Sequence, residues 1–148
     1  TVSVCSSKGL GAPVGSLLAG DEETIMEARR ARKAFGGGMR QAGIIAAAAL
    51  YAFENHVDRL GEDHEHASYL ASGLREAGYE AKEPETNLVL VAVDDPPEFL
   101  QALAREGVLA TPGKPGFVRL CTHLDVGESE IEAAIQSAAR ITTSAIER

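Results

Sequence analysis

The feature that most constrains the fold is a glycine-rich segment near the start of the chain, residues 8–15, with the sequence KGLGAPVG. It lies between two short runs of β-type composition, residues 1–7 and 15–20. Three glycines and a proline let the backbone turn sharply and exclude a helix there. We therefore expect a strand, a tight loop that carries Lys8, and a second short strand that ends at Gly20.

Two phosphate-binding motifs can be compared with this segment, and neither matches. The glycine spacing is one residue too long for a dinucleotide-binding fingerprint, and a P-loop lysine follows its glycines, whereas Lys8 precedes them. A lysine held at a strand end in a restricted loop can be partly desolvated, which lowers its pKa and lets its amine attack a carbonyl. An ordinary exposed lysine is the alternative reading of Lys8.

Composition narrows the range of partners. The formal net charge of −8 over 148 residues argues against a nucleic-acid partner, which would need a basic face, and favours a small-molecule partner. The longest apolar run, residues 42–53, is too short to span a bilayer, and there is no signal-peptide pattern. We therefore expect a cytoplasmic protein without membrane contact.

Cys5 and Cys121 stand in no metal-binding spacing, so we expect two buried, reduced thiols.

The remaining elements follow from apolar periodicity, caps and breakers. Asp21 is the expected N-cap of the first helix, which ends in a basic run that includes Lys33. From residue 87 onward, the order of strand, helix, strand and helix suits a small α+β unit with helices on one face of a sheet. The further elements that we expect are helices at about 39–59, 62–77, 96–107 and 127–148, strands at 87–93 and 117–124, and an irregular segment at 108–116.

Two positions are candidates for binding anions. Three glycines at 36–38 run into the expected start of a helix, with Arg40 in its first turn and Lys33 before them. A helix N-terminus attracts anions, and a cation there is unfavourable unless an anion lies between, so we expect a phosphate or carboxylate near Arg40. The alternatives are a simple tight turn and, for Lys33, a helix-end charge. The alanine-rich helix that follows is expected to be buried against neighbours.

The strand at 117–124 contains the second candidate. If Val118 and Leu120 face one way, Arg119 faces the other, as a charge within an otherwise apolar strand. A buried arginine needs an anionic partner, which is either a structural carboxylate or the carboxylate of an amino-acid substrate. We expect His123 to be structural, with a catalytic role as the alternative. His64 and His66 are two positions apart, which does not suit a helical metal pair, so we expect solvated residues and no metal site.

Three segments together resemble the low-specificity L-threonine aldolases, which are pyridoxal 5'-phosphate enzymes of the aspartate-aminotransferase-like fold, fold type I. They are SSKGLGAPVGSLLAG at 6–20, RKAFGGGMRQAGIIAAAALYA at 32–52, and VRLCTHLDV at 118–126. The resemblance runs in order over essentially the whole chain. It implies that residues 1–60 are the C-terminal part of the large α/β domain with a connecting helix, and that 61–148 are the small C-terminal α+β domain.

The resemblance also assigns roles. It makes Lys8 the residue that is covalently linked to pyridoxal phosphate, with Ser7 beside the cofactor. Arg40 and Lys33 match basic residues near the cofactor phosphate, and Arg119 matches the arginine that holds the substrate carboxylate. The implied enzyme is a lyase of amino-acid metabolism and glycine biosynthesis, a homotetramer that cleaves threonine or allo-threonine to glycine and an aldehyde.

The resemblance also shows what this chain lacks. The acid that pairs with the pyridine nitrogen, the histidine that stacks on the ring and the phosphate-binding turn all lie upstream of Lys8 in the family. We therefore expect that this chain needs the upstream half of the same protein as a partner. Two alternatives stay open: a related β-eliminating lyase of the same fold, and a catalytically inactive fragment that needs a partner chain.

Overall fold

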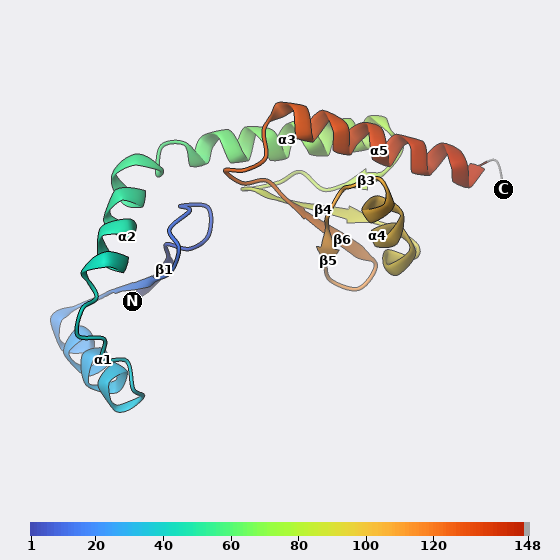
Figure 1. Ribbon diagram of the computed structural model, residues 1–148. Helices are drawn as coiled ribbons and strands as arrows, with labels where there is room; N and C mark the ends of the chain where they lie inside the picture. The colour runs from blue at the N-terminus through green and yellow to red at the C-terminus, as the bar shows by residue number, and fades with distance from the viewer. Residues whose placement is uncertain (147–148) are drawn as a thin grey trace. The chain divides into compact units, whose positions relative to one another are not determined.

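The chain divides into two compact units, residues 1–60 and 61–148. The structure is a computed structural model that describes residues 1–146, with side chains described through residue 142 (Figure 1). The last two residues of the helix expected at 127–148, and the side chain of Ala145 on its apolar stripe, lie outside the described residues. No helix in the described range is long and apolar enough to cross a membrane.

The first unit begins with an antiparallel hairpin and a capped helix. Strand β1 (Val2–Cys5) pairs with β2 (Ser16–Ala19), so the expected strand, loop and strand are all present. Helix α1 (Glu22–Ala34) follows directly. Its N-cap is Asp21, as expected, because the Asp21 carboxylate accepts a hydrogen bond of 2.8 Å from the backbone N–H at residue 24.

Helix α2 (Gly43–Asn55) corrects two expectations. It begins four residues later than expected, so Arg40 lies in the preceding bend and does not oppose the helix dipole. Residues 39–41 are exposed, and packing rather than propensity usually decides helix length, so nothing stabilises an earlier start. The helix is also largely exposed: Ala52 is its buried residue, whereas the side chain of Ile44 is 85% exposed.

The second unit is built on a four-stranded antiparallel sheet in the order β3-β4-β6-β5. Helix α3 precedes the sheet, α4 follows β4, and α5 follows β6 (Figure 1). The two edge strands were not expected, because two-residue strands are too short to give a pattern. The bounds are α3 Leu60–Glu76, β3 Glu80–Ala81, β4 Leu88–Ala92, α4 Pro96–Arg105, β5 Thr111–Pro112, β6 Phe117–Cys121 and α5 Glu128–Ile146.

The core of this unit lies between one face of the sheet and the three helices. The alternating residues of β4 and β6 that face it are fully or almost fully buried, among them Val89, Val91 and Val118. Residues from α3, α4 and α5 belong to the same cluster, which confirms that the helices share one face. The remaining members are Ala67, Leu70, Ala71, Leu74, Ala81, Phe99, Leu103, Leu120, Ile131, Ala134 and Ala138.

Candidate functional site

The loop between β1 and β2 is closed by hydrogen bonds at its base. Ser6 is fully buried, and both its backbone N–H and its hydroxyl donate to the carbonyl of Gly15, at 3.1 and 2.9 Å. The Ser6 carbonyl in turn accepts from the N–H of Ala12 at 3.0 Å. Gly15 has φ of +131°, and a Cβ there would lie 2.9 Å from the Ser6 Oγ, so this position needs glycine. The loop thus has a defined backbone.

Lys8 lies at the outer side of this loop. Its carbonyl accepts from the N–H of Gly11 at 2.8 Å, which closes a four-residue turn. Leu10 and Ala12 are buried against Ala52 of α2, whereas the Lys8 side chain is exposed. Its Nζ forms no hydrogen bond or salt bridge with the residues that the structure describes. The backbone of the turn is therefore fixed and the amine is accessible, so the desolvation expected for Lys8 is not found in this unit.

Cys5 shares this corner with the predicted cofactor residue Ser7. The Cys5 Sγ lies 3.6 Å from the hydroxyls of both Ser16 and Ser7. The hydrogen bond from Ser16, then that from Ser7, and to a smaller extent the charge of Lys8 hold the pKa of the Cys5 thiol below its usual value. The expectation that Cys5 is buried is wrong, because β1 lies on the exposed hairpin.

Cys121, on the second unit, is also an exposed free thiol, against expectation. It follows the alternation of β6, which places it on the sheet face opposite the helices. Partial burial raises the pKa of the Cys121 thiol, and the charge of Arg119 opposes that effect. The two cysteines therefore have pKa values shifted in opposite directions.

The glycine segment at 36–38 lies between the two predicted phosphate residues. Lys33 is in the last turn of α1, and a Cβ on Gly38 would lie 3.1 Å from its Nζ, so its ammonium group folds back over the segment. Arg40 is exposed in the bend just beyond. The structure thus places two exposed cations beside a stretch of bare backbone, without the helix N-terminus that was expected to attract the anion.

Arg119 lies on the open face of the sheet in the second unit. It is exposed, which corrects the expectation of a buried charge: β6 turns Val118 and Leu120 toward the helices and Arg119 away from them. Its Nε donates to the Thr111 hydroxyl on the neighbouring strand at 3.1 Å. Within the described part of the chain it forms no salt bridge, so the structural ion pair considered as an alternative is not found there.

The three remaining histidine candidates do not form a site. The His123 Nδ1 accepts a hydrogen bond from the backbone N–H of Asp125 at 3.3 Å, which fits the expected structural role. His64 is exposed, whereas His66 is only half exposed and has a buried Nδ1 without a hydrogen-bond partner in the described structure. Among the described residues, no group of three or more His, Cys, Asp or Glu could hold a metal ion.

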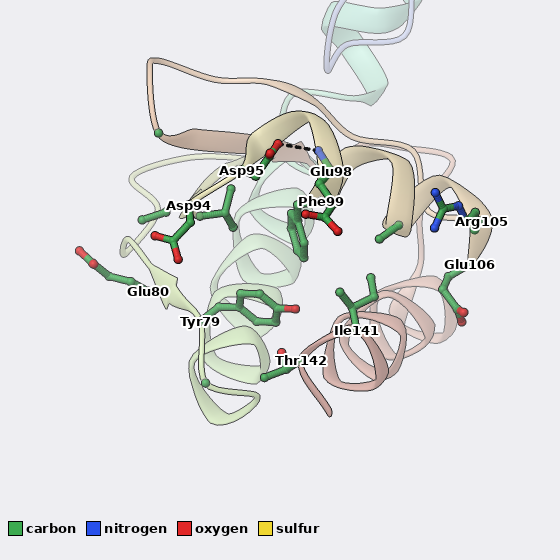
Figure 2. Close-up of a pocket in the computed structure, with 15 residues that line it drawn as sticks. Tyr79, Glu80, Asp94, Asp95, Glu98, Phe99, Arg105, Glu106, Ile141 and Thr142 are labelled. Atoms are coloured by element: carbon green, nitrogen blue, oxygen red, sulfur yellow. Dashed lines mark hydrogen bonds between the residues drawn. The ribbon is translucent and has the colours of Figure 1, made fainter. Parts of the chain in front are cut away.

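A cavity of about 720 Å³ in the second unit contains none of the predicted residues. Figure 2 shows the rings of Tyr79 and Phe99 next to each other, and the side chains of Glu80 and Asp94 to one side of them. The two ring centroids are 5.1 Å apart. The Tyr79 hydroxyl donates to the Ala138 carbonyl at 2.9 Å. The residues that line this cavity are scattered between positions 78 and 142, so no local motif in the sequence could have predicted the cavity.

Comparison with solved structures defines the class of fold. Over 95% of this chain and 39% of its own, aspartate aminotransferase from Thermotoga maritima matches with a TM-score of 0.73 and 22% identity. Serine palmitoyltransferase from Sphingomonas wittichii matches over 96% of this chain and 40% of its own, with a TM-score of 0.69 and 19% identity. The chain therefore has the aminotransferase-like fold type I of the pyridoxal-phosphate enzymes, as expected.

Sequence comparisons identify the family within that class. The family model described as beta-eliminating lyase matches residues 1–96, and the chain belongs to this family. The low-specificity L-threonine aldolase of Escherichia coli strain K12 is 47% identical over 135 residues, which are 87% of this chain and 39% of that protein. Low-specificity L-threonine aldolase 1 of Arabidopsis thaliana is 35% identical over 139 residues, 88% of this chain and 39% of its own length. The chain thus spans about two fifths of these relatives.

Proposed function

We propose that the complete protein is a pyridoxal-phosphate-dependent aldolase that cleaves threonine and allo-threonine to glycine and an aldehyde. One observation carries this proposal: the accessible amine of Lys8 stands on a loop with a fixed backbone, in a chain 47% identical over 135 residues to a threonine aldolase. A primary amine so placed can bond to the aldehyde of the cofactor.

The residues of the first unit fit pyridoxal phosphate. Lys8 supplies the amine, Ser7 a neighbouring hydroxyl, and Lys33 and Arg40 two exposed cations suited to a phosphate. When bound, this cofactor takes up the electron pair released as the Cα–Cβ bond of the substrate breaks. Lys33 and Arg40 would bind the phosphate of the cofactor that belongs to the same or to a neighbouring subunit.

Arg119 is the residue that we assign to the substrate carboxylate. A guanidinium binds a carboxylate through two parallel hydrogen bonds, which fixes orientation as well as position. Thr111 holds the Nε of Arg119, and this leaves the Nη groups for an amino-acid substrate. By holding the carboxylate, Arg119 decides which bond of the substrate is aligned for cleavage.

Further properties of the complete enzyme remain predictions. We infer that residues 1–60 belong to its large cofactor-binding domain and 61–148 to its small domain. The upstream half of the same protein completes the site, and the enzyme works as a homo-oligomer, a dimer or tetramer, in the cytoplasm. Its place in amino-acid metabolism is the production of glycine.

The test uses the complete protein. We expect glycine and acetaldehyde from threonine or allo-threonine, and Lys8→Ala to lower this rate by on the order of a thousandfold or more. Borohydride reduction with pyridoxal phosphate, followed by peptide mass mapping, should place the pyridoxyl group on Lys8. The matched control is Lys114→Ala, which removes an exposed lysine of the second unit. A pyridoxyl group on another lysine of a folded sample would contradict the assignment.

A related β-eliminating lyase is the second candidate, favoured by the family model that matches residues 1–96. It predicts pyruvate and ammonia from an amino acid with a leaving group on Cβ, and no glycine from threonine or allo-threonine. If the chain is instead an inactive fragment, residues 1–148 alone take up no cofactor, and only addition of the missing half restores uptake.

A further inference from the structure

The turn that carries Lys8 is joined to the end of α2 by one long-range hydrogen bond. The Nδ1 of His56 and the carbonyl oxygen of Leu10 are 2.6 Å apart, although the two residues are 46 positions apart in sequence. Because a carbonyl oxygen can only accept, the proton lies on Nδ1, and the imidazole is the donor. His56 therefore contacts the backbone two residues after Lys8.

The Leu10 carbonyl needs this donor. In the four-residue turn from Lys8 to Gly11, the internal hydrogen bond uses the first carbonyl and the last N–H and leaves the carbonyl of Leu10 unpaired. Leu10 is only 6% exposed. A buried backbone carbonyl without a partner is strongly disfavoured, so the bond from His56 decides where this part of the turn can lie.

The imidazole of His56 is itself held in place. His56 follows the last residue of α2, and its backbone N–H donates to the carbonyl of Ala52 at 2.8 Å. Its ring meets the ring of Tyr51 edge-on, with centroids 5.6 Å apart and an interplanar angle of 89°. Ala52 is also the residue against which Leu10 packs. The end of α2 thus holds the turn through both a hydrogen bond and an apolar contact.

We propose that His56 is a positioning residue for the reaction, which acts by holding the Leu10 carbonyl and thereby fixes the direction of the Lys8 amine. This inference rests on the proposed function of Lys8. The imidazole donates to the Leu10 carbonyl and not to the Lys8 amine. A small misplacement of a reacting group lowers the rate of the chemical step much more than it lowers binding. Loss of the donor should therefore act on kcat.

The experiment compares four versions of the complete protein: wild type, His56→Phe, His56→Asn and His64→Phe. Phe keeps a ring but has no donor, Asn keeps an N–H donor, and His64 is an exposed histidine on α3 that serves as the matched control. We expect His56→Phe to lower kcat for threonine by about 10- to 100-fold while KM changes by less than about threefold. His56→Asn should recover at least about half of that loss on a logarithmic scale, and His64→Phe should behave as wild type.

Hydrogen exchange provides a readout that does not depend on the reaction. The N–H groups of Gly11 and Ala12 are bonded within the loop, so they should exchange faster in His56→Phe than in wild type, and nearly normally in His56→Asn. If His56→Phe does not fold, His56→Ala serves as the variant without a donor. Unchanged exchange in a folded donor-free variant would overturn the link between His56 and the turn.

The remaining outcomes separate the positioning role from a structural one. Faster exchange with an unchanged kcat in folded, cofactor-loaded protein would show that His56 only stabilises the loop, and would overturn the proposal. If wild type cleaves neither threonine nor allo-threonine, the proposed function fails, and the rate of pyridoxyl labelling at Lys8 in His56→Phe then decides the positioning role. Labelling of a different lysine in wild type would overturn both.

Discussion

The two units differ in what holds them together. Among its described residues, the second unit has fourteen buried apolar residues in one core, drawn from three helices, both central strands and the edge strand β3. The first unit has three: Leu10, Ala12 and Ala52. Its order comes instead from local hydrogen bonds, such as those of Ser6 and Asp21. Because burial of apolar surface is the main stabilising contribution to folding, most of the stability of this chain lies in the second unit.

The proposed site residues are concentrated in the other unit, the one with the smaller core. Four of the five residues proposed for the site, Lys8, Ser7, Lys33 and Arg40, belong to the first unit, and only Arg119 belongs to the second. The unit with the smaller core thus carries the amine that we propose as the reactive group. This comparison teaches that the order of the Lys8 loop depends on a few specific contacts and cannot be read from the stability of the whole chain.

Separating the units gives the largest expected effect. Residues 61–148 expressed alone should unfold in one cooperative thermal transition, because their core is complete within that range. Residues 1–60 alone should show no such transition, since three buried residues offset little of the chain entropy. Circular dichroism during heating tests both. A cooperative transition in residues 1–60 would contradict the inference that the core of this unit is too small to fold alone.

Truncation of one leucine in each unit comes next. Leu74 is 2% exposed in the core of the second unit, so Leu74→Ala should lower the free energy of unfolding by about 2–5 kcal/mol. Leu50 on α2 is 59% exposed, and Leu50→Ala should change the free energy of unfolding by less than about 0.5 kcal/mol. Urea unfolding of residues 1–148 measures both. Equal effects would mean that α2 is as well packed as α3.

Two glycines of α3 test how tightly the second unit is packed. A Cβ on Gly73 would overlap the Ile135 side chain of α5, with its Cγ1 only 2.8 Å away, so Gly73→Ala should cost about 1–3 kcal/mol of unfolding free energy. Apart from its chain neighbours and the local helix backbone, no atom lies within 4 Å of such a Cβ on Gly61, so Gly61→Ala should stabilise by up to about 1 kcal/mol. Adding Ile135→Ala should reduce the cost at Gly73. If Gly73→Ala leaves the free energy of unfolding unchanged, α3 and α5 can move apart to make room for the added Cβ.

The two cysteines give the smallest effect, which is a difference in rates. Hydrogen bonds from Ser16 and Ser7 lower the pKa of Cys5, and burial raises that of Cys121. Because the thiolate is the nucleophile, Cys5 has the larger reactive fraction at neutral pH and should be alkylated several times faster. Mass spectrometry of residues 1–148 treated with iodoacetamide measures both sites. The two alkylation rates should converge in denaturant. Equal rates in the folded chain would contradict the opposite pKa shifts of the two thiols.

Local patterns predicted the elements whose residues are close together in sequence. The glycines and proline around Lys8 indicated the loop, Asp21 indicated its helix, and the alternation of β6 placed Arg119 opposite Val118. The same alternation could not say which face the helices cover, so the exposure of Arg119 was missed. The late start of α2 was also missed, because composition does not reveal whether neighbours are present to pack against it.

Contacts between distant residues were beyond sequence reasoning. The pairing of Ser6 with Gly15 and of His56 with Leu10 joins positions that share no motif, and each exists only because the backbone brings the two partners together. The two-residue strands β3 and β5 are likewise defined by their partners rather than by their own composition. These contacts around the candidate site were therefore visible only in the structure.

The short edge strands have a consequence for assembly. The sheet of the second unit ends on both sides in strands of two residues, and one of them contains Pro112, which has no N–H to offer a further strand. Each edge strand therefore offers at most two residues for pairing with another chain. In the described structure, β1 and β2 pair only with each other over four residues, so each leaves a full row of backbone groups unpaired. Growth of a sheet by edge-to-edge pairing is thus restricted in one unit and open in the other.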